Sequence, residues 1–193
     1  HAHVREFSEF TPPREPLIFL KPSTSVIGPD DTIIIPKASV GHVDYECELA
    51  VVIGKKAKDV PENKAADYIL GYTCANDVTE RVFQKEDGQW TRAKGFDTFA
   101  PLGPYIVTCI LPDNLRIETY LNGEVRQSSS TSNLIFGVPR LVSFISQVMT
   151  LLPGDIISTG TPGGIGRINP GDVVEVKIEK IGVLRNFVAA SRD

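Results

Sequence analysis

The 193-residue chain has an ordinary globular composition, in which 41% of the residues are hydrophobic and 23% are charged. This composition excludes a disordered or fibrous protein, and the length suits a single domain. The formal net charge of −4 excludes the basic surface of a general nucleic-acid-binding protein. No apolar run reaches the roughly 18 residues that span a bilayer, so we expect no membrane insertion.

Prolines (14) and glycines (16) divide the chain into short elements, which favours many strands over a helical bundle. A proline ends each of the first two apolar runs, and Gly54 ends a longer one. We expect strands at 17–21, 32–35, 45–53 and 68–75, a short helix at 61–67 that begins at a proline, and a helix at 77–85 capped by Thr79 or Asp77.

Asn122 and Gly123 predict a hairpin between strands at 117–121 and 124–127. Both residues tolerate the positive φ angles of a type I′ turn. The serine-rich stretch at 127–132 is interpreted as a loop.

A helix is predicted at 138–150, where apolar residues recur with helical spacing. Further strands are expected at 155–159, 173–179 and 183–188. The whole chain is therefore predicted to be a β-rich α+β domain of about ten strands and two or three helices. The residues expected on the apolar helix face are Leu141, Phe144, Ile145 and Val148.

The three cysteines, Cys47, Cys74 and Cys109, are an odd number and lie far apart in the chain. They cannot form a disulfide framework, and the chain has no CxxC pair for a metal. We interpret them as buried packing residues of a protein in a reducing, cytoplasmic setting.

Two glutamates on the predicted strand at 45–53 are the first candidates for chemistry. Because side chains alternate along a strand, Glu46 and Glu48 point to one face, about 7 Å apart, while Cys47 and Leu49 point to the other. The two carboxylates repel each other unless a cation or water lies between them. The face turns apolar beyond Glu48, which favours a pocket over the alternative, a solvated edge strand.

A third carboxylate, Asp77, follows the buried-looking strand at 68–75. Alone it could be a helix cap. With Glu46 and Glu48 it would complete an all-oxygen site for a hard divalent cation, namely Mg²⁺, Mn²⁺ or Ca²⁺. No HxH or HxxxH pair lies near these residues, which disfavours zinc.

Two further features could bind an anionic substrate. Lys94 lies between the small residues Ala93 and Gly95 and could act as a point charge, the alternative being an ordinary surface lysine. The loop at 159–166, which contains Thr161, offers backbone N–H groups and a hydroxyl. It lacks the Gly-Lys-Ser/Thr of a P-loop, and its alternative is a flexible turn.

His3 and Glu6 stand three residues apart and so share a face of a helical turn. Such a pair can activate water, with the carboxylate orienting the imidazole. The alternative is a frayed or tag-derived terminus, since the chain opens without methionine.

In their order and spacing, these segments resemble the fumarylacetoacetate hydrolase family in its catalytic C-terminal domain. Each segment is weak alone, but the joint order is specific and covers nearly the whole chain. The segments are His3-Val4-Arg5-Glu6, Leu20-Lys21-Pro22-Ser23, Asp44-Tyr45-Glu46-Cys47-Glu48-Leu49, Gly71-Tyr72 through Asn76-Asp77-Val78-Thr79, Ala93-Lys94-Gly95-Phe96-Asp97, Asn122-Gly123-Glu124, Thr159-Gly160-Thr161-Pro162 and Ile181-Gly182-Val183-Leu184-Arg185-Asn186.

The resemblance implies a mixed β-sandwich roll, one catalytic domain over 1–193, and a homodimer. Members of the family have a strand before the lid histidine, so we expect one upstream of His1. The implied site comprises Mg²⁺ or Mn²⁺, with Ca²⁺ as a third candidate, on Glu46, Glu48 and Asp77, substrate contacts from Arg81, Gln84, Lys94 and Thr161, and water activation by His3 and Glu6 on a mobile lid at 1–15.

The family's substrates are β-dicarbonyl or 2-keto acids of the kind found in aromatic catabolism. The resemblance implies that the metal acts as a Lewis acid and stabilises the enolate that forms when a C–C bond breaks. Hydrolysis, decarboxylation and isomerisation can all use such a site, so the reaction stays open among the three.

Two alternatives belong to other functional classes. A catalytically silent family member would keep the metal site and bind a small molecule, but the presence of both His3 and Glu6 favours an enzyme. A phosphoryl-transfer enzyme would use more carboxylates. Its phosphate would also need basic residues, and Arg167 alone lies near the loop at 159–166.

Overall fold

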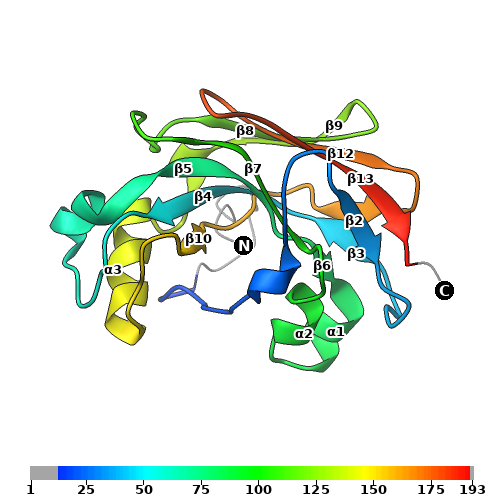
Figure 1. The fold of residues 1–193 in the computed structure, drawn as a ribbon, viewed down its shortest axis with the longest axis horizontal. Coiled ribbons are helices and arrows are strands. Elements are labelled where there is room, and N and C mark those ends of the chain that lie inside the picture. Colours follow the sequence, from blue (N-terminus) through cyan, green and yellow to red (C-terminus); the bar gives the residue numbers. More distant parts are fainter. Residues whose placement is uncertain (1–12, 192–193) are drawn as a thin grey trace.

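Two five-stranded sheets packed against each other form most of the molecule, and a three-stranded sheet lies beside them (Figure 1). The structure is a computed structural model that describes residues 13–191. The larger sheets are mixed: β1 (Val26–Ile27) is parallel to β7 (Ala100–Val107), and β2 (Thr32–Ile35) is parallel to β13 (Gly182–Ala190), while their other pairs are antiparallel. The predicted β-rich α+β fold, a mixed β-sandwich roll, is confirmed.

The first sheet has the strand order β1-β7-β5-β4-β10. Its centre is the antiparallel pair β4 (Cys47–Ile53) and β5 (Ile69–Asn76), in which Cys47 lies opposite Asn76. β10 (Ile156–Ser158) pairs with the other side of β4. All seven residues of β4 are buried, because the strand has neighbours on both sides and is covered on both faces.

The second sheet has the strand order β2-β13-β12-β8-β9 and covers the first. The predicted hairpin is confirmed, with β8 (Arg116–Leu121) and β9 (Glu124–Ser130) joined by Asn122 and Gly123. The φ angles of these two residues, 52° and 81°, are positive as a type I′ turn requires. β12 (Val173–Ile178) pairs with β8 and β13.

The small sheet, β11-β3-β6, corrects the single long strand predicted around Glu46. That strand is two strands, β3 (Val43–Tyr45) and β4, because the chain changes sheets at Glu46. The Glu46 N–H donates to the side-chain oxygen of Asn76 at 2.9 Å. β3 pairs with β6 (Thr79–Glu80) and β11 (Gly166–Ile168). Glu46 therefore lies at the junction of two sheets.

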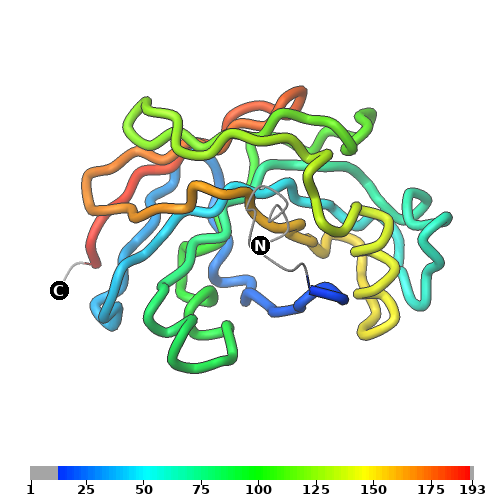
Figure 2. Tube along the Cα trace, turned by 180° about the vertical axis from the view of Figure 1, so that it is seen from behind, coloured from blue at the N-terminus to red at the C-terminus, as the bar shows by residue number. Residues whose placement is uncertain are grey.

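The helix predicted at 138–150 is present as α3 (Val138–Val148) and packs against the 3₁₀ helix η3 (Glu62–Tyr68). The buried residues of α3 include Val138 and Leu141, whereas Val148, which was predicted on the apolar face, is 59% exposed. The buried face is therefore rotated about the helix axis relative to the predicted one. The views from both sides place α3 at one end of the molecule (Figures 1 and 2). Within residues 13–191, no helix is long and apolar enough to cross a membrane.

The helix predicted at 77–85 starts later than expected, as α1 (Arg81–Glu86). Thr79 and Glu80 instead pair with β3 as β6, which takes them out of the helix. The cap is Glu80, whose carboxylate accepts the N–H of Phe83 at 2.7 Å. The elements that complete this region are α2 (Thr91–Lys94) and, earlier in the chain, the 3₁₀ helix η2 (Ser23–Ser25).

Two other predictions about local structure were wrong. The stretch at 17–21 is irregular, although it reads as an apolar strand. The serine-rich stretch at 127–132 is mostly strand, because its first residues pair with β8 as part of β9 before the 3₁₀ helix η4 (Thr131–Asn133) begins. The short helix expected at 61–67 is present, as the 3₁₀ helix η3.

Two hydrophobic clusters hold the sheets together. The larger lies between the two five-stranded sheets and joins Leu49 of β4 to Ile117 of β8 and Val176 of β12. Cys47 and Cys74 belong to it, as predicted. The smaller cluster lies around the small sheet, and the predicted burial of the third cysteine was wrong, since Cys109 is exposed after β7.

Candidate metal centre and substrate pocket

Three buried carboxylates meet where the first sheet adjoins the small sheet. Glu46 lies at the junction, Glu48 points to the same side from β4, and Asp77 follows β5. One oxygen of each lies within 4.8 Å of the others, and each residue is at most 3% exposed. The solvated edge strand and the helix cap, considered as alternatives for these residues, are therefore wrong.

The pleat of β4 explains this arrangement. Glu46 and Glu48 alternate with Cys47 and Leu49, which enter the larger hydrophobic cluster. The backbone N–H of Asp77 donates to the carbonyl of Glu46 at 2.9 Å, which fixes the third carboxylate beside the first. Backbone hydrogen bonds thus fix the positions of all three carboxylate residues, as a preorganised site requires.

Three basic side chains contact the carboxylates. Lys94 Nζ lies 2.5 Å from Asp77 Oδ2 and 3.2 Å from Glu46 Oε2. Lys21 Nζ lies 2.5 Å from Asp77 Oδ1, and Arg81 Nη2 lies 2.6 Å from Glu46 Oε1. Lys94 is only 1% exposed, so it is not an ordinary surface lysine.

The carboxyl groups have pKa values shifted in opposite directions. Burial, together with the neighbouring Asp77 and Glu46, raises the pKa of Glu48 to about 8. Burial also acts to raise the pKa of Asp77, but Lys21 and Lys94 outweigh it and hold that pKa at about 2. Burial alone would lower the pKa of Lys94, but Asp77 and Glu46 raise it overall.

The donor set fits a hard divalent cation. Three carboxylate oxygens this close together in a buried site repel one another, and the raised pKa of Glu48 reflects that repulsion. A dication removes the repulsion, and oxygen ligands select Mg²⁺, Mn²⁺ or Ca²⁺. The carboxylates of this region outnumber the cations that pair with them, Asp44, Glu46, Glu48 and Asp77 against Lys21, Arg81 and Lys94.

Arg81 and Gln84, predicted to face the site, lie one turn apart on α1. Arg81 Nε donates to Asp44 Oδ2 at 2.7 Å and Nη1 donates to Gln84 Oε1 at 2.8 Å. Gln84 lines the pocket, whereas Arg81 reaches the carboxylates through its ion pair with Glu46. Asp44, to which the sequence analysis assigned no role, therefore orients the guanidinium.

The loop that contains Thr161 binds a carboxylate of the protein itself. The backbone N–H of Gly160 donates to Glu48 Oε2 at 2.7 Å. Thr161 is buried, accepts a hydrogen bond from Gln127 Nε2 at 2.9 Å, and is not among the described residues that line the pocket. Gln127 Oε1 also accepts the N–H of Cys47 at 3.0 Å, so one amide ties the loop to β4.

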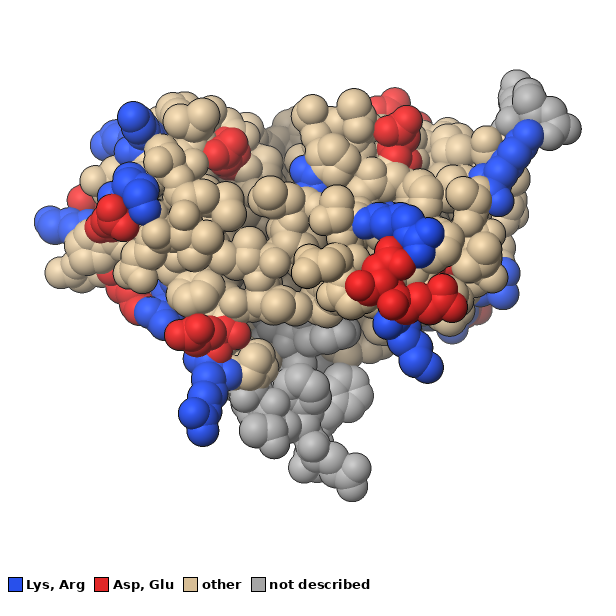
Figure 3. Space-filling model, turned by 90° about the horizontal axis from the view of Figure 1, so that it is seen from below, with Lys and Arg blue, Asp and Glu red and all other residues tan. Residues whose placement is uncertain are grey.

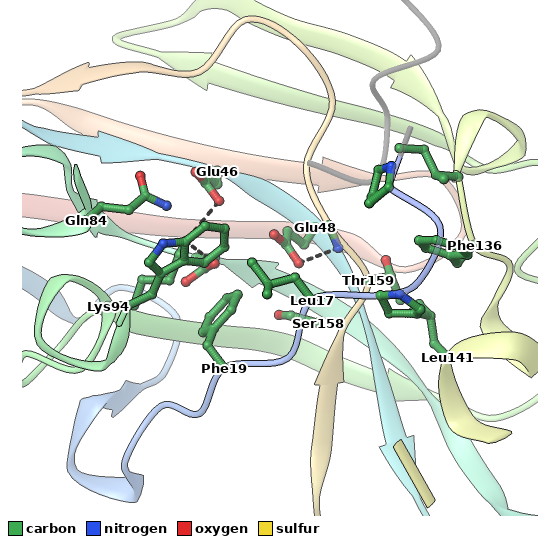
Figure 4. A pocket seen from close by; sticks show the side chains of 16 residues that line it. Leu17, Phe19, Glu46, Glu48, Gln84, Lys94, Phe136, Leu141, Ser158 and Thr159 are labelled. Atoms are coloured by element: carbon green, nitrogen blue, oxygen red, sulfur yellow. Dashed lines mark hydrogen bonds and ion pairs between the residues drawn. The ribbon is translucent and has the colours of Figure 1, made fainter. Parts of the chain in front are cut away.

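The carboxylates open into a cavity of about 310 Å³, as the side-chain pattern of β4 predicted. In Figure 4, Gln84 and Lys94 lie at one side of the cavity, and Phe136 and Leu141 lie at the other, with Glu48 between them. The volume is that of a small-molecule site.

The proposed water-activating pair lies outside the described residues. His3 and Glu6 both precede residue 13, where the described structure begins. Of the lid predicted at 1–15, only the last three residues are described; they are exposed, and Pro13 lines the cavity.

Several residues of the site were not found by sequence analysis. Lys21 lies in a segment that carried the family resemblance, so that resemblance could have identified it. Phe19 and Trp90 line the cavity, with ring centroids 5.5 Å apart, and Lys94 Nζ lies 4.8 Å from the centroid of Phe19. Gln127 carries no sequence signal, because the Cys47 N–H and the Thr161 hydroxyl that it contacts lie 80 and 34 positions away.

Known proteins share both the sequence and the fold of this chain. The family model described as the fumarylacetoacetate (FAA) hydrolase C-terminal domain matches residues 1–189. The crystal structure of 5-carboxymethyl-2-hydroxymuconate delta-isomerase from Mycobacterium smegmatis has a TM-score of 0.93 and 51% sequence identity, and the match covers 100% of this chain and 76% of that one.

Two further similar proteins have different enzyme names. Maleylpyruvate hydrolase from Sphingobium sp. SYK-6, solved with manganese(II) and pyruvate, has a TM-score of 0.83 and 35% identity over 90% of this chain and 64% of that one. The mitochondrial oxaloacetate tautomerase Fahd2a of Rattus norvegicus is 45% identical over 91% of this chain and 59% of its own length. These three similar proteins thus carry enzyme names that differ in the reaction.

Proposed function

This chain belongs to the fumarylacetoacetate hydrolase family, and we propose that it is a divalent-metal-dependent enzyme that hydrolyses a C–C bond in a β-dicarbonyl or 2-keto acid, as in acylpyruvate hydrolysis. One observation carries this proposal: the buried group of Glu46, Glu48 and Asp77, beside Lys94, lies in the wall of a small-molecule pocket. The names of the similar hydrolase, isomerase and tautomerase support chemistry at an enolisable keto acid.

The proposed cofactor is Mg²⁺ or Mn²⁺, with Ca²⁺ as a third candidate, on Glu46, Glu48 and Asp77. Manganese in the similar maleylpyruvate hydrolase supports this choice. When bound, such an ion polarises a keto oxygen and stabilises the negative charge that develops beside it. The excess of carboxylates at this end of the pocket supports the need for a cation.

Lys94 and Gln84 line the pocket and are proposed to bind the substrate. The Lys94 ammonium would hold the carboxylate of the keto acid as a point charge, and the Gln84 amide would donate to a neighbouring oxygen. Arg81 would position Glu46 while Asp44 orients its guanidinium. Thr161 is proposed as a further contact: since Gln127 donates to its oxygen, its hydroxyl keeps its own proton to donate.

Water activation is assigned to His3 and Glu6. The pair would remove a proton from water as its oxygen adds to the acyl carbonyl. The bond between that carbonyl carbon and the adjacent methylene then breaks, and its electron pair becomes the enolate of a 2-keto acid. Protonation gives the keto acid, and the acyl part leaves as a carboxylic acid. Without attack by water, the same site would decarboxylate or isomerise its substrate.

The test is turnover of a small substrate panel with added Mg²⁺ or Mn²⁺. The panel holds acetylpyruvate, fumarylpyruvate, oxaloacetate and a 2-hydroxydienedioate. We expect metal-dependent loss of one substrate, abolished in Glu46→Ala and retained in Glu124→Ala, whose glutamate is exposed on the hairpin. Metal binding without turnover of any substrate would contradict the proposal and favour a catalytically silent binding protein. His3→Ala distinguishes the two reactions, because it should abolish hydrolysis, which needs water activation, and leave isomerisation in place.

A homodimer in a reducing cytoplasm is also part of the proposal. Large apolar side chains at and after β7 are exposed, with Tyr105 at 70% and Leu111 at 81%. The face shown in Figure 3 has a mostly uncharged middle, with its charged side chains mainly toward the two ends. All three cysteines are free, as a reducing compartment would keep them. Light scattering coupled to size exclusion would test the dimer.

A further inference from the structure

The two ends of the pocket differ in chemistry. At one end lie Glu46, Gln84 and Lys94, and at the other lie Phe136 and Leu141, with Glu48 between them (Figure 4). Leu141 is 7% exposed and belongs to the larger hydrophobic cluster, and Phe136 packs against that cluster. The apolar end is therefore continuous with the protein core. Ile135, the chain neighbour of Phe136, also lines the pocket, as do Pro13, Pro16 and Leu17.

Within the described residues 13–191, the apolar end offers no positive charge for a second anionic group. Among the described residues that line the pocket, Lys94 is the only lysine or arginine, and it lies at the carboxylate end. Arg140 on α3 is engaged elsewhere, because its Nη1 lies 3.2 Å from Glu62 and its guanidinium stacks over Phe144. A carboxylate held at the apolar end would lose water without gaining a cationic partner from the described lining residues, which is costly.

We propose that the substrate is a 2-keto acid whose far end is an uncharged alkyl or aryl tail, and that this tail lies against Ile135, Phe136 and Leu141. The head group, with its carboxylate and keto oxygen, would lie at Glu46, Glu48, Asp77 and Lys94. This inference rests on the proposed function for the position of the head group. It selects acylpyruvates with apolar acyl groups and disfavours dicarboxylates.

The expected effect follows from burial of the tail. Each methylene that moves from water to an apolar site strengthens binding by about fourfold. A terminal carboxylate in place of a methyl group should weaken binding by roughly tenfold or more, because a buried charge without a partner is unfavourable. A longer substrate tail should therefore strengthen binding only when the tail is uncharged.

Binding can be measured apart from catalysis through Trp90. The chain has one tryptophan, and it lines the pocket, so its fluorescence reports occupancy. In the presence of Mg²⁺, we expect 2-oxohexanoate to bind more tightly than pyruvate and at least about tenfold more tightly than 2-oxoadipate, which has a second carboxylate at its far end. Neither six-carbon acid is a β-dicarbonyl, so both serve as binding probes. Equal or tighter binding of 2-oxoadipate would overturn the inference.

A charge placed at the apolar end should reverse the preference. Ile135 is only partly buried and is not a member of either core cluster, so Ile135→Arg should fold, and Ile135→Met is the matched uncharged control. We expect Ile135→Arg to favour 2-oxoadipate and Ile135→Met to keep the wild-type order. Should Ile135→Arg misfold, Phe136→Arg, at a partly buried residue of the apolar end, makes the same test. An unchanged preference in a folded arginine variant would contradict the placement of the tail.

Turnover separates the two proposals. Hexanoylpyruvate and succinylpyruvate carry an apolar and a charged tail on the same reacting group. Preferred hydrolysis of succinylpyruvate would support the proposed function and overturn the inference about the tail. Hydrolysis of neither, together with selective binding of 2-oxohexanoate, would overturn the proposed function and support the tail site.

Discussion

The two faces of β4 have the same backbone pairing and the same burial but opposite chemistry. On one face Cys47 and Leu49 pack into the larger hydrophobic cluster. On the other, Glu48 lies beside Asp77 and Glu46, the residue that directly precedes the strand. Burial of apolar groups stabilises a fold, whereas burial of adjacent carboxylates destabilises it unless a cation lies between them. The core face therefore stabilises the strand, and the pocket face is held in a geometry that a bound ion would favour.

The largest expected effect comes from removing one charge on the pocket face. Glu48→Gln keeps the shape of the side chain but removes a metal ligand, and we expect metal-dependent turnover to fall to background. The loss should exceed the roughly 10- to 100-fold typical of changes outside the ligand shell. The measurement is kcat/KM with titrated Mn²⁺, together with calorimetric Mn²⁺ affinity.

The same variant separates the role of Glu48 as a metal ligand from its effect on the stability of the fold. Without metal, Glu48→Gln should be more stable than wild type, and the gain should be larger near pH 9 than near pH 6, because Glu48 is ionised above its pKa of about 8. Glu124→Gln, on the exposed hairpin, is the control. Unchanged Mn²⁺ affinity in Glu48→Gln would remove Glu48 from the metal site.

On the core face, the expected effect is on stability alone. Leu49→Ala leaves a cavity in the larger cluster and should lower the free energy of unfolding by about 2–5 kcal/mol. The kcat of the folded fraction should stay close to that of wild type. Urea unfolding gives the stability, and Leu152→Ala, at a residue 51% exposed, should change it by about 0.5 kcal/mol or less. A large fall in kcat for Leu49→Ala would show that the two faces are not separable.

The alternation along β4 was readable in the sequence because strand side chains have a period of two, so residue order alone assigns Glu46 and Glu48 to one face. The split of the strand at Glu46 was not readable. It depends on the side chain of Asn76, which takes the place of a backbone partner from 30 positions away. Likewise, Thr79 and Glu80 form β6 only because β3 lies beside them, which no local propensity indicates.

The residues of the site show the same difference between what local sequence indicates and what tertiary contacts determine. Glu46, Glu48, Asp77 and Lys94 were found because residue type and family spacing identify them. Lys21 and Trp90 were not assigned roles, because their contribution comes from tertiary contact with Asp77 and with Phe19. Local sequence thus predicted which groups carry charge, and the fold determined which of them meet.

Gln127 connects the two faces and should show a smaller effect on both. It lies on β9, and its amide contacts both Cys47 on the core side and Thr161 on the loop beside the pocket. Gln127→Met keeps the volume but leaves the buried N–H of Cys47 without its partner, which should cost about 1–3 kcal/mol of stability. Loss of the hydrogen bond to Thr161 should lower kcat by roughly tenfold, the range of outer-shell partners.

The control for this prediction is Gln147→Met, on an exposed glutamine near the end of α3, which should change neither stability nor kcat. Denaturant unfolding and steady-state kinetics on the two variants give both readouts. A stability loss in Gln127→Met without any change in kcat would assign Gln127 to the core alone.

The smallest expected effect is the release of one proton when the metal ion binds. Burial and the neighbouring carboxylates raise the pKa of Glu48 from an ordinary 4.5 to about 8, so below pH 8 the metal-free site holds a proton that a cation must displace. Binding of Mg²⁺ should release close to one proton at about pH 6.5 and almost none near pH 9, and affinity should rise about tenfold per pH unit until it levels off above pH 8. Calorimetry in two buffers of different ionisation enthalpy counts the proton.

The same shift fixes the sign of the effect on stability. Because the folded, metal-free chain binds this proton more tightly than the unfolded chain, its stability should fall as pH rises from about 4.5 through about 8. Saturating Mg²⁺ should reduce that fall, since a bound cation replaces the proton, and Glu48→Gln should lack this part of the pH dependence. Proton release that is the same at both pH values would show that Glu48 is already ionised in the metal-free site. The pocket face would then be neutralised by Lys21, Arg81 and Lys94 alone.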